Sequence, residues 1–165
     1  LEILRIPYCD GFMSFIGEGF PPNLISLKIL NLKSCEPLFQ CGLHRLTSLR
    51  ELWISGEDPD LVFFPPTEMV LPKSLIQLIV EDFPNLRYLS SKGFQFLTSL
   101  KSLYIWTCPK LESIPYEGQL VPLTQLSIRR CPLLEARCKP GKGRYWRSIA
   151  HVPYIWLGDR RIIAP

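Results

Sequence analysis

The sequence predicts a repeat solenoid in which short parallel strands stack side by side into an open arc. Its 165 residues include 27 Leu and 16 Pro but three Ala, and the proline share is about twice the usual ~5%. Each interior proline costs a helix roughly 3 kcal/mol, and alanine is the best helix former. The composition therefore excludes helical bundles and helix-rich doubly wound folds. The hydrophobic fraction of 47% also excludes intrinsic disorder.

The leucines recur in a fixed pattern. Anchor leucines stand 23, 25, 26, 25 and 23 residues apart along the chain. They are Leu1, Leu24, Leu49, Leu75, Leu100 and Leu123. A second leucine follows each anchor after three residues, and an isoleucine or valine follows two residues later. This LxxLxL pattern, with a period inside the range of roughly 20–29 residues, is that of the leucine-rich repeat.

Each LxL segment predicts a short strand, because alternate side chains of a strand point to opposite faces. The inward leucines of one repeat cannot close a core alone, so neighbouring repeats must stack, with a parallel sheet on the concave side. The return segments contain prolines, among them Pro21, Pro22, Pro65 and Pro66. Because proline fixes φ near the extended region, we expect a helix-poor convex side of irregular or polyproline-like backbone.

A third landmark stands three residues after the second aliphatic position, where many such repeats carry Asn or Cys. It is occupied by Cys9, Leu32, Glu57, Phe83, Cys108 and Cys131. In the second repeat, Leu27, Leu30, Leu32 and Cys35 also satisfy the pattern. Two registers therefore remain open for that repeat.

The pattern divides the chain into two parts. Residues 1–134 carry about six leucine-rich repeats, which start near residues 1, 24, 49, 75, 100 and 123. The leucine period stops after Cys131, and we expect residues 135–165 to form a C-terminal cap with a basic tail. The residues expected to cover the last core layer are Trp146, Ile149, Val152 and Ile155. No such cap precedes Leu1, so we expect the chain to be a piece of a longer protein whose upstream domains are missing.

The C-terminal part carries a family resemblance. The run LSIRRCPLLEARC at residues 126–138, followed by Trp146 and by IAHVPYI at residues 149–155, resembles the end of plant nucleotide-binding leucine-rich-repeat disease resistance proteins. Within that family the coiled-coil subclass is the most similar. The segments CPKLESIP at residues 108–115 and LHRLTSL at residues 43–49 support the resemblance, which covers essentially the whole chain.

The resemblance implies a protein-binding sensor and autoinhibitory module of an intracellular immune receptor, acting in the defence response to pathogens. In that family an upstream nucleotide-binding domain switches between ADP and ATP, and the repeats restrain it until a pathogen molecule is perceived. No cofactor is expected in this chain itself. The expected partners are a pathogen effector, a guarded host protein or the receptor's own nucleotide-binding domain. The family's Cys or Asn is replaced at Glu57 and Phe83.

Catalytic, nucleotide and metal sites have little support in the sequence. Residues 139–144 lack the GxxxxGK[ST] order of a phosphate loop. Cys35, Cys41 and His44 have no second pair at metal-ligand spacing, so no zinc site is expected. The histidines, His44 and His151, accompany no nucleophile motif, and the chain is not expected to be an enzyme. No apolar stretch reaches the 18 or so residues of a membrane span.

Cysteine placement and the lack of glycosylation motifs predict a cytoplasmic protein. Three cysteines recur at one repeat position, where a buried thiol behaves as a small apolar group. None of Asn23, Asn31 and Asn85 begins an N-x-[ST] motif. An extracellular repeat receptor remains an alternative, as does a substrate-recruiting adaptor of an F-box-type ubiquitin ligase. The uneven repeat length of 23–26 residues counts against the adaptor.

Charge is concentrated near the C-terminus. Residues 129–161 hold nine basic and two acidic residues, whereas residues 1–128 hold ten basic and thirteen acidic residues. Such a basic end could dock an acidic partner or nucleic acid. A solvated cap face is the favoured interpretation, and nucleic acid is an unlikely partner, because no nucleic-acid-binding motif accompanies the charge.

The outward side chains of the strands form the candidate binding face. The central column reads Arg5, Lys28, Trp53, Ile79, Tyr104 and Ser127, and the next reads Pro7, Leu30, Ser55, Glu81, Trp106 and Arg129. Exposed apolar and aromatic patches mark interaction surfaces, although a neighbouring domain of the same protein could also cover this one. The residues predicted to bind protein are Arg5, Lys28, Trp53, Ile79, Tyr104, Trp106 and Arg129.

Overall fold

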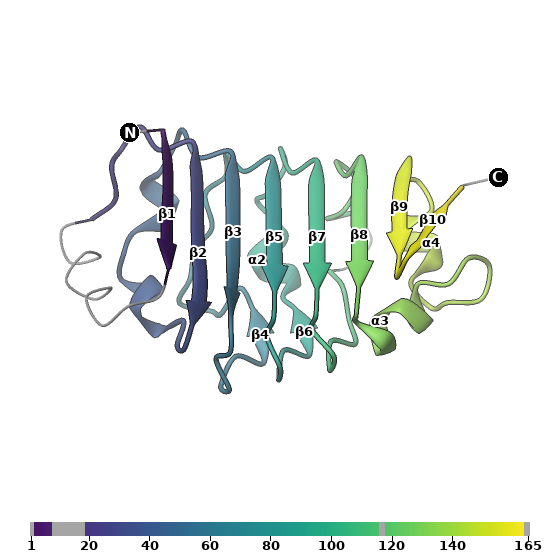
Figure 1. Cartoon of the computed structure of the whole chain (residues 1–165). Coiled ribbons are helices and arrows are strands. Elements are labelled where there is room, and N and C mark those ends of the chain that lie inside the picture. The colour runs from purple at the N-terminus through teal and green to yellow at the C-terminus, as the bar shows by residue number, and fades with distance from the viewer. Residues whose placement is uncertain (1, 8–18, 116–117, 164–165) are drawn as a thin grey trace.

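A computed structural model describes residues 2–7, 19–115 and 118–163. Within these residues, eight strands form one sheet in the order β1-β2-β3-β5-β7-β8-β9-β10 (Figure 1). The strands are β1 (Ile3–Pro7), β2 (Ser26–Leu32), β3 (Glu51–Gly56), β5 (Gln77–Glu81), β7 (Ser102–Trp106), β8 (Gln125–Arg129), β9 (Tyr154–Leu157) and β10 (Arg160–Ile162). Neighbouring strands are parallel except β9 and β10, which are antiparallel. The predicted parallel sheet is confirmed.

The inward aliphatic side chains align in two rows across the sheet. One row consists of Leu4, Leu27, Leu52, Leu78, Leu103, Leu126 and Ile155. The other consists of Ile6, Ile29, Ile54, Val80, Ile105, Ile128 and Leu157. All are buried except Leu4 and Leu157, which lie near the two ends of the sheet and are half-buried. Burial of each such side chain contributes roughly 1.5–3 kcal/mol, so these rows both fix the register and form the core.

The two registers left open for the second repeat each describe part of β2. Up to Ile29 the strand pairs with β3 in the register that starts at Leu24. Beyond Ile29 the ladder shifts, and Leu32 lies opposite Gly56. Asn31 accommodates the extra residue with a φ of 58°, in the left-handed region that Asn tolerates. Gly56 is required here because a Cβ at this position would overlap the Leu32 carbonyl.

The third landmark is one residue out of place in the repeat of β3. Glu57 is exposed, whereas the next residue, Asp58, is 5% exposed and points inward. Its carboxylate accepts the backbone N–H groups of Cys35 at 2.7 Å and of Asp60 at 2.9 Å. The assignment of the landmark to Glu57 is therefore wrong. At the other described landmark positions the side chains are buried, and Cys9 lies outside the described residues.

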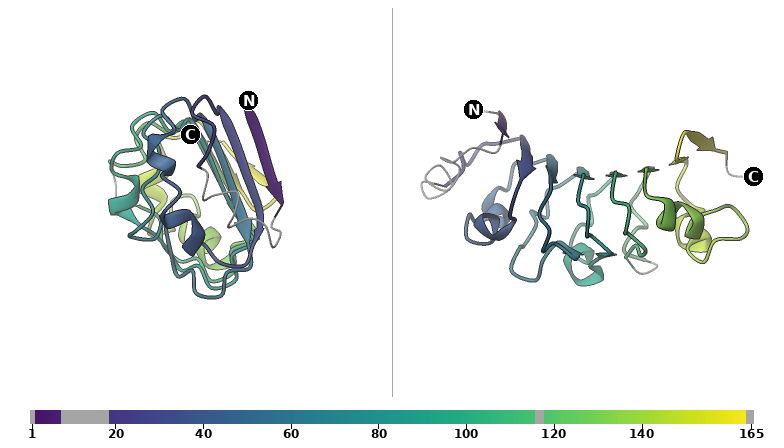
Figure 2. Two further views of the ribbon diagram at one scale, coloured as in Figure 1. Left: turned by 90° about the vertical axis from the view of Figure 1, so that its left-hand side faces the viewer. Right: turned by 60° about the horizontal axis from the view of Figure 1, so that its bottom comes forward.

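Short helices and turns form the opposite side of the molecule. They include η1 (Glu36–Phe39), η2 (Leu43–Arg45) and α2 (Ser91–Phe94). A second, two-stranded parallel sheet also lies there, made of β4 (Phe63–Phe64) and β6 (Tyr88–Leu89), and this sheet was not predicted. Figure 2 shows the main sheet along one side of a shallow arc and these segments along the other. Few helices and a thin convex side agree with the proline-rich return segments.

The leucine period, expected to stop after Cys131, continues for one more strand. Helices α3 (Pro132–Arg137) and α4 (Trp146–Ile149) lead into β9, which pairs with β8 in the common register. Val152 and Ile155, expected only to cover the core, occupy the anchor and strand positions of this additional unit. Ile149 is buried and Trp146 packs against the core, as expected. None of the helices in the described ranges is both long enough and apolar enough to cross a bilayer.

Candidate functional site

The predicted binding residues lie in two adjacent columns on the concave face. The central column places Arg5, Lys28, Trp53, Ile79, Tyr104 and Ser127 opposite one another on consecutive strands, and Trp156 of β9 extends it. In the next column Trp106 lies between Glu81 and Arg129. These columns face away from the core because successive side chains of a strand point to opposite faces.

Three aromatic side chains contact one another at the centre of this face. The ring centroids of Trp53 and Trp106 are 5.9 Å apart with an interplanar angle of 83°, and those of Tyr104 and Trp106 are 5.5 Å apart. Strands β3 and β7 are separated by β5, so their backbones lie about 9.6 Å apart. The two indole rings therefore lean toward each other across β5. Ile79 of β5 occupies its predicted position, but it is 3% exposed and offers almost no contact area to a partner.

Hydrogen bonds between strands hold these aromatic rings in place. Trp53 Nε1 donates to Glu81 Oε2 at 3.0 Å, and Trp106 Nε1 donates to Ser127 Oγ at 3.1 Å. The Tyr104 hydroxyl donates to Gln125 Oε1 at 2.6 Å. Rings that are fixed before binding lose little conformational entropy when a partner arrives.

Burial determines the ionisation of the carboxylate beside Trp53. It raises the pKa of Glu81, and the neighbouring charge of Asp82 adds to the effect. The hydrogen bond that Trp53 donates stabilises the charged form and opposes the rise. Glu81 is thus a partly buried acceptor that serves the aromatic cluster.

Charges at the N-terminal half of the face are largely neutralised. Lys28 Nζ lies 4.9 Å from the centroid of the Trp53 ring and 3.8 Å from Glu51 Oε1. Glu51 also accepts hydrogen bonds from Ser26 Oγ and from Gln77 Nε2, each at 3.1 Å. Lys28 is therefore positioned as predicted, but its charge is already balanced within the face.

The C-terminal half of the face carries two aromatic residues that the sequence analysis assigned to a cap. Tyr154 and Trp156 of β9 are 48% and 37% exposed. The guanidinium carbon of Arg129 lies 5.3 Å from the centroid of the Trp156 ring. That of Arg161 lies 5.3 Å from the centroid of the Tyr154 ring. The alternation of Tyr154, Trp156 and their buried neighbour Ile155 is the signal that could have revealed this extension.

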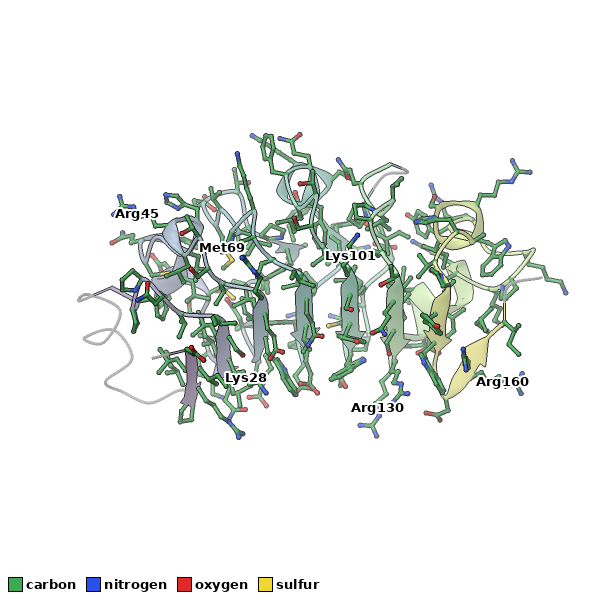
Figure 3. The ribbon with its side chains drawn as sticks, turned by 90° about the horizontal axis from the view of Figure 1, so that it is seen from above. Lys28, Arg45, Met69, Lys101, Arg130 and Arg160 are labelled. Atoms are coloured by element: carbon green, nitrogen blue, oxygen red, sulfur yellow. The ribbon has the colours of Figure 1, made fainter. Side chains whose placement is uncertain are left out.

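Two hollows flank these arginine–aromatic pairs. One, of about 510 Å³, lies beside Trp106 and Arg129. The other, of about 240 Å³, is bounded by Tyr104, Tyr154, Trp156 and Arg161. Figure 3 shows Lys28 and Arg130 projecting on the side of the sheet, whereas Arg45 and Met69 lie on the opposite side of the arc. The side chains suited to contact a partner therefore continue from Trp53 to the last strands.

The convex side contains a further hollow of about 470 Å³. Apolar side chains form most of its wall, among them Met69, Val70 and Phe96. His44, which the sequence placed in a return segment, also borders it, whereas His151 lies in the cap with its Nε2 3.0 Å from the Leu120 carbonyl oxygen. Neither histidine lies on the concave face.

The described cysteines are free thiols that lie mostly in the core. They are Cys35, Cys41, Cys108, Cys131 and Cys138. Burial raises the pKa of Cys41 to about 11 and that of Cys138 to about 12, so both thiols are protonated at neutral pH and poorly nucleophilic. In the described part of the chain, His, Cys, Asp and Glu side chains form no group of three that could hold a metal ion.

Sequence comparison relates this chain to a plant protein. No protein-family model matches it. It is 34% identical over 137 residues to a protein of Arabidopsis thaliana that is named as a candidate disease resistance protein. The match covers 83% of this chain and 9% of that relative, so the chain spans a small part of the relative's length. The resemblance predicted from the sequence is thereby confirmed, and the chain is related to plant disease resistance proteins.

Proposed function

We propose that this chain is a leucine-rich-repeat module that binds proteins through the concave face of its sheet. Its place would be in a cytoplasmic plant immune receptor, where it senses a pathogen effector or a guarded host protein. The same face would restrain the receptor by contacting its nucleotide-binding domain, which would carry ADP or ATP. The module itself would need no cofactor and would catalyse no reaction.

The aromatic cluster of Trp53, Tyr104 and Trp106 is the observation that carries this proposal. Tryptophan, tyrosine and arginine are the residues most often found as energetic hot spots of protein interfaces. Here hydrogen bonds from neighbouring strands hold all three rings on one face. The regular register of the strands and the relationship to a plant disease resistance protein support the repeat assignment and the defence role.

Single alanine substitutions in the full-length parent protein test the proposal. Trp53→Ala or Trp106→Ala is expected to alter the response to the effector, or to release a constitutive cell-death response when the receptor is expressed in leaves. Phe96→Ala, a change of another exposed aromatic residue on the convex side, is the matched control and should behave as the unmodified receptor. Loss of the ring contact costs about 0.5–1.5 kcal/mol, so both tryptophan variants should still fold.

Circular dichroism of the corresponding 165-residue variants checks folding directly. The proposal fails if the folded tryptophan variants respond and remain restrained as the unmodified receptor does. It also fails if either variant unfolds, because the tryptophan would then be a core residue.

A further inference from the structure

Strand β9 presents two aromatic rings that are each covered by an arginine. Arg161 lies opposite Trp156 in the antiparallel pairing of β9 and β10, so its side chain is on the same face. Its guanidinium covers Tyr154, while Arg129, from β8, covers Trp156. Arginine stacked on an aromatic ring keeps the edge of its guanidinium plane open for hydrogen bonds to an anion. The two stacks therefore present two oriented donor groups.

Neither of these arginines has an acidic partner within the described residues. Ion pairs there involve Lys28, Lys33, Arg87 and Arg137. Arg129 and Arg161 are exposed, and nothing in the described chain compensates their charge at ion-pair distance. The face consequently changes from balanced charge near Lys28 to unpaired positive charge at β8 and β9.

The carboxylates that border this area are mostly engaged elsewhere. Glu81 accepts the Trp53 indole N–H, and Glu135 accepts the Cys131 backbone N–H at 3.0 Å. Asp159 also borders the hollow beside Arg129. No acidic side chain lines the hollow beside Arg161. Three carboxylates next to Arg129 would repel a continuous phosphate backbone, but a peptide can place single carboxylates between them.

The spacing of the two stacks fits an extended peptide. Tyr154 and Trp156 are two residues apart on one strand, which separates their side chains by about 6.6 Å. Acidic side chains at positions i and i+2 of an extended peptide have the same separation and the same direction. Arg–carboxylate pairs are also the strongest and most directional of the common charge-assisted hydrogen bonds.

We propose that the β8–β10 end of the concave face docks an extended acidic segment of a partner protein. Carboxylates two residues apart on that segment bind Arg129 and Arg161. The inference rests on the proposed function, because it names the chemical class of the partner that the concave face binds.

Titration calorimetry on the 165-residue chain tests this docking site. The probe is a blocked peptide of alternating Glu and Thr, and the comparison peptide has Gln in place of every Glu. The acidic peptide is expected to bind and the Gln peptide to bind at least about tenfold more weakly. The double variant Arg129→Gln/Arg161→Gln is expected to bind the acidic peptide about fivefold to tenfold more weakly than the unmodified chain.

The cap offers a matched control of equal charge. Arg144 lies 5.2 Å above the Tyr145 ring, so it forms the same kind of stack away from the strands. Arg144→Gln/Arg147→Gln should leave peptide affinity unchanged. The proposal is overturned if both double variants weaken binding equally, if the acidic peptide does not bind, or if a ten-residue oligothymidylate binds more tightly in an Arg129- and Arg161-dependent manner.

The leaf assay of the full-length protein distinguishes this failure from failure of the proposed function. If Trp106→Ala alters the response while Arg129→Gln/Arg161→Gln does not, concave-face binding stands and the acidic partner is wrong. If neither variant alters the response, both proposals fail. If both variants alter it and the cap control does not, both are supported.

Discussion

Truncation of Asp58 tests whether a buried carboxylate joins two neighbouring repeats. Its Oδ2 accepts the backbone N–H of Cys35 at 2.7 Å across 23 residues of chain, and its Oδ1 accepts the N–H of Asp60 at 2.9 Å. The first bond connects the return segment after β2 to the one after β3. The second closes the local turn. Asp58→Ala removes both acceptors at once.

The expected loss follows from what each N–H group finds afterwards. Cys35 is buried, so its N–H would lack any partner, which costs about 1–3 kcal/mol. Asp60 is exposed, and water can replace its acceptor for about 1 kcal/mol or less. We therefore expect Asp58→Ala to lower the free energy of unfolding by about 2–3 kcal/mol. Asp58→Asn keeps a carbonyl acceptor for Cys35 and should lose about 1 kcal/mol.

Urea unfolding of the 165-residue chain, followed by tryptophan fluorescence, measures these differences. Asp60→Ala is the control, because it deletes an exposed carboxylate in the same turn and should change stability by at most about 0.5 kcal/mol. Amide hydrogen exchange at Cys35 adds a local measurement and should accelerate in Asp58→Ala alone. Equal stabilities of Asp58→Ala and Asp60→Ala would refute the reasoning, since the buried N–H would then have cost nothing.

Two further predictions concern the core. Leu103→Ala should lower the free energy of unfolding by about 2–5 kcal/mol, because Leu103 is 0% exposed at the centre of an aliphatic row; a loss in urea unfolding below about 1 kcal/mol would contradict its place in the core. Alkaline pH should also destabilise the chain: burial raises the pKa of Cys138 to about 12 from 9.0, so an unfolded chain ionises this thiol first. Its contribution is intact below pH 9.0 and declines as the pH rises toward about 12, so Cys138→Ser should show a smaller loss of stability between those values, and identical losses in the two proteins would contradict this.

The strands could be predicted because their inward positions obey two independent spacings. Within a repeat, Leu103 and Ile105 are two residues apart, as one face of a strand requires. Between repeats, the same positions recur after about 25 residues and pair directly, as Leu78 does with Leu103. The register also fixed the outward columns, so Trp53, Tyr104 and Trp106 were placed on the correct face. The packing of their rings over β5, which buries Ile79, depends on rotamers that a spacing pattern does not encode.

The elements that were missed carry weaker or longer signals. Val152 occupies the anchor position of the β9 unit without being a leucine, and it follows Leu123 after 29 residues, so the period appeared to stop. Strands β4 and β6 contain two residues each, too few to produce any periodicity. Asp58 escaped notice because Glu57 occupied the expected landmark. In that repeat the chain gains one residue and shifts the inward position by one.

The ends of the strands explain why the concave face can be rigid while its side chains differ from repeat to repeat. Thr107 and Arg130, which directly follow the face residues Trp106 and Arg129, both have a φ of 53°. This left-handed conformation costs a residue with a Cβ about 1–2 kcal/mol, and it persists only where the surroundings compensate. Backbone bonds between repeats supply that compensation, since Thr107 N–H donates to the Arg129 carbonyl at 2.9 Å and Asp82 N–H donates to the Trp106 carbonyl at 3.1 Å. The backbone beneath the aromatic and arginine columns is therefore fixed from both sides by the register. Affinity for a partner then depends on which side chains stand in the columns, because little ordering of the backbone remains to oppose binding.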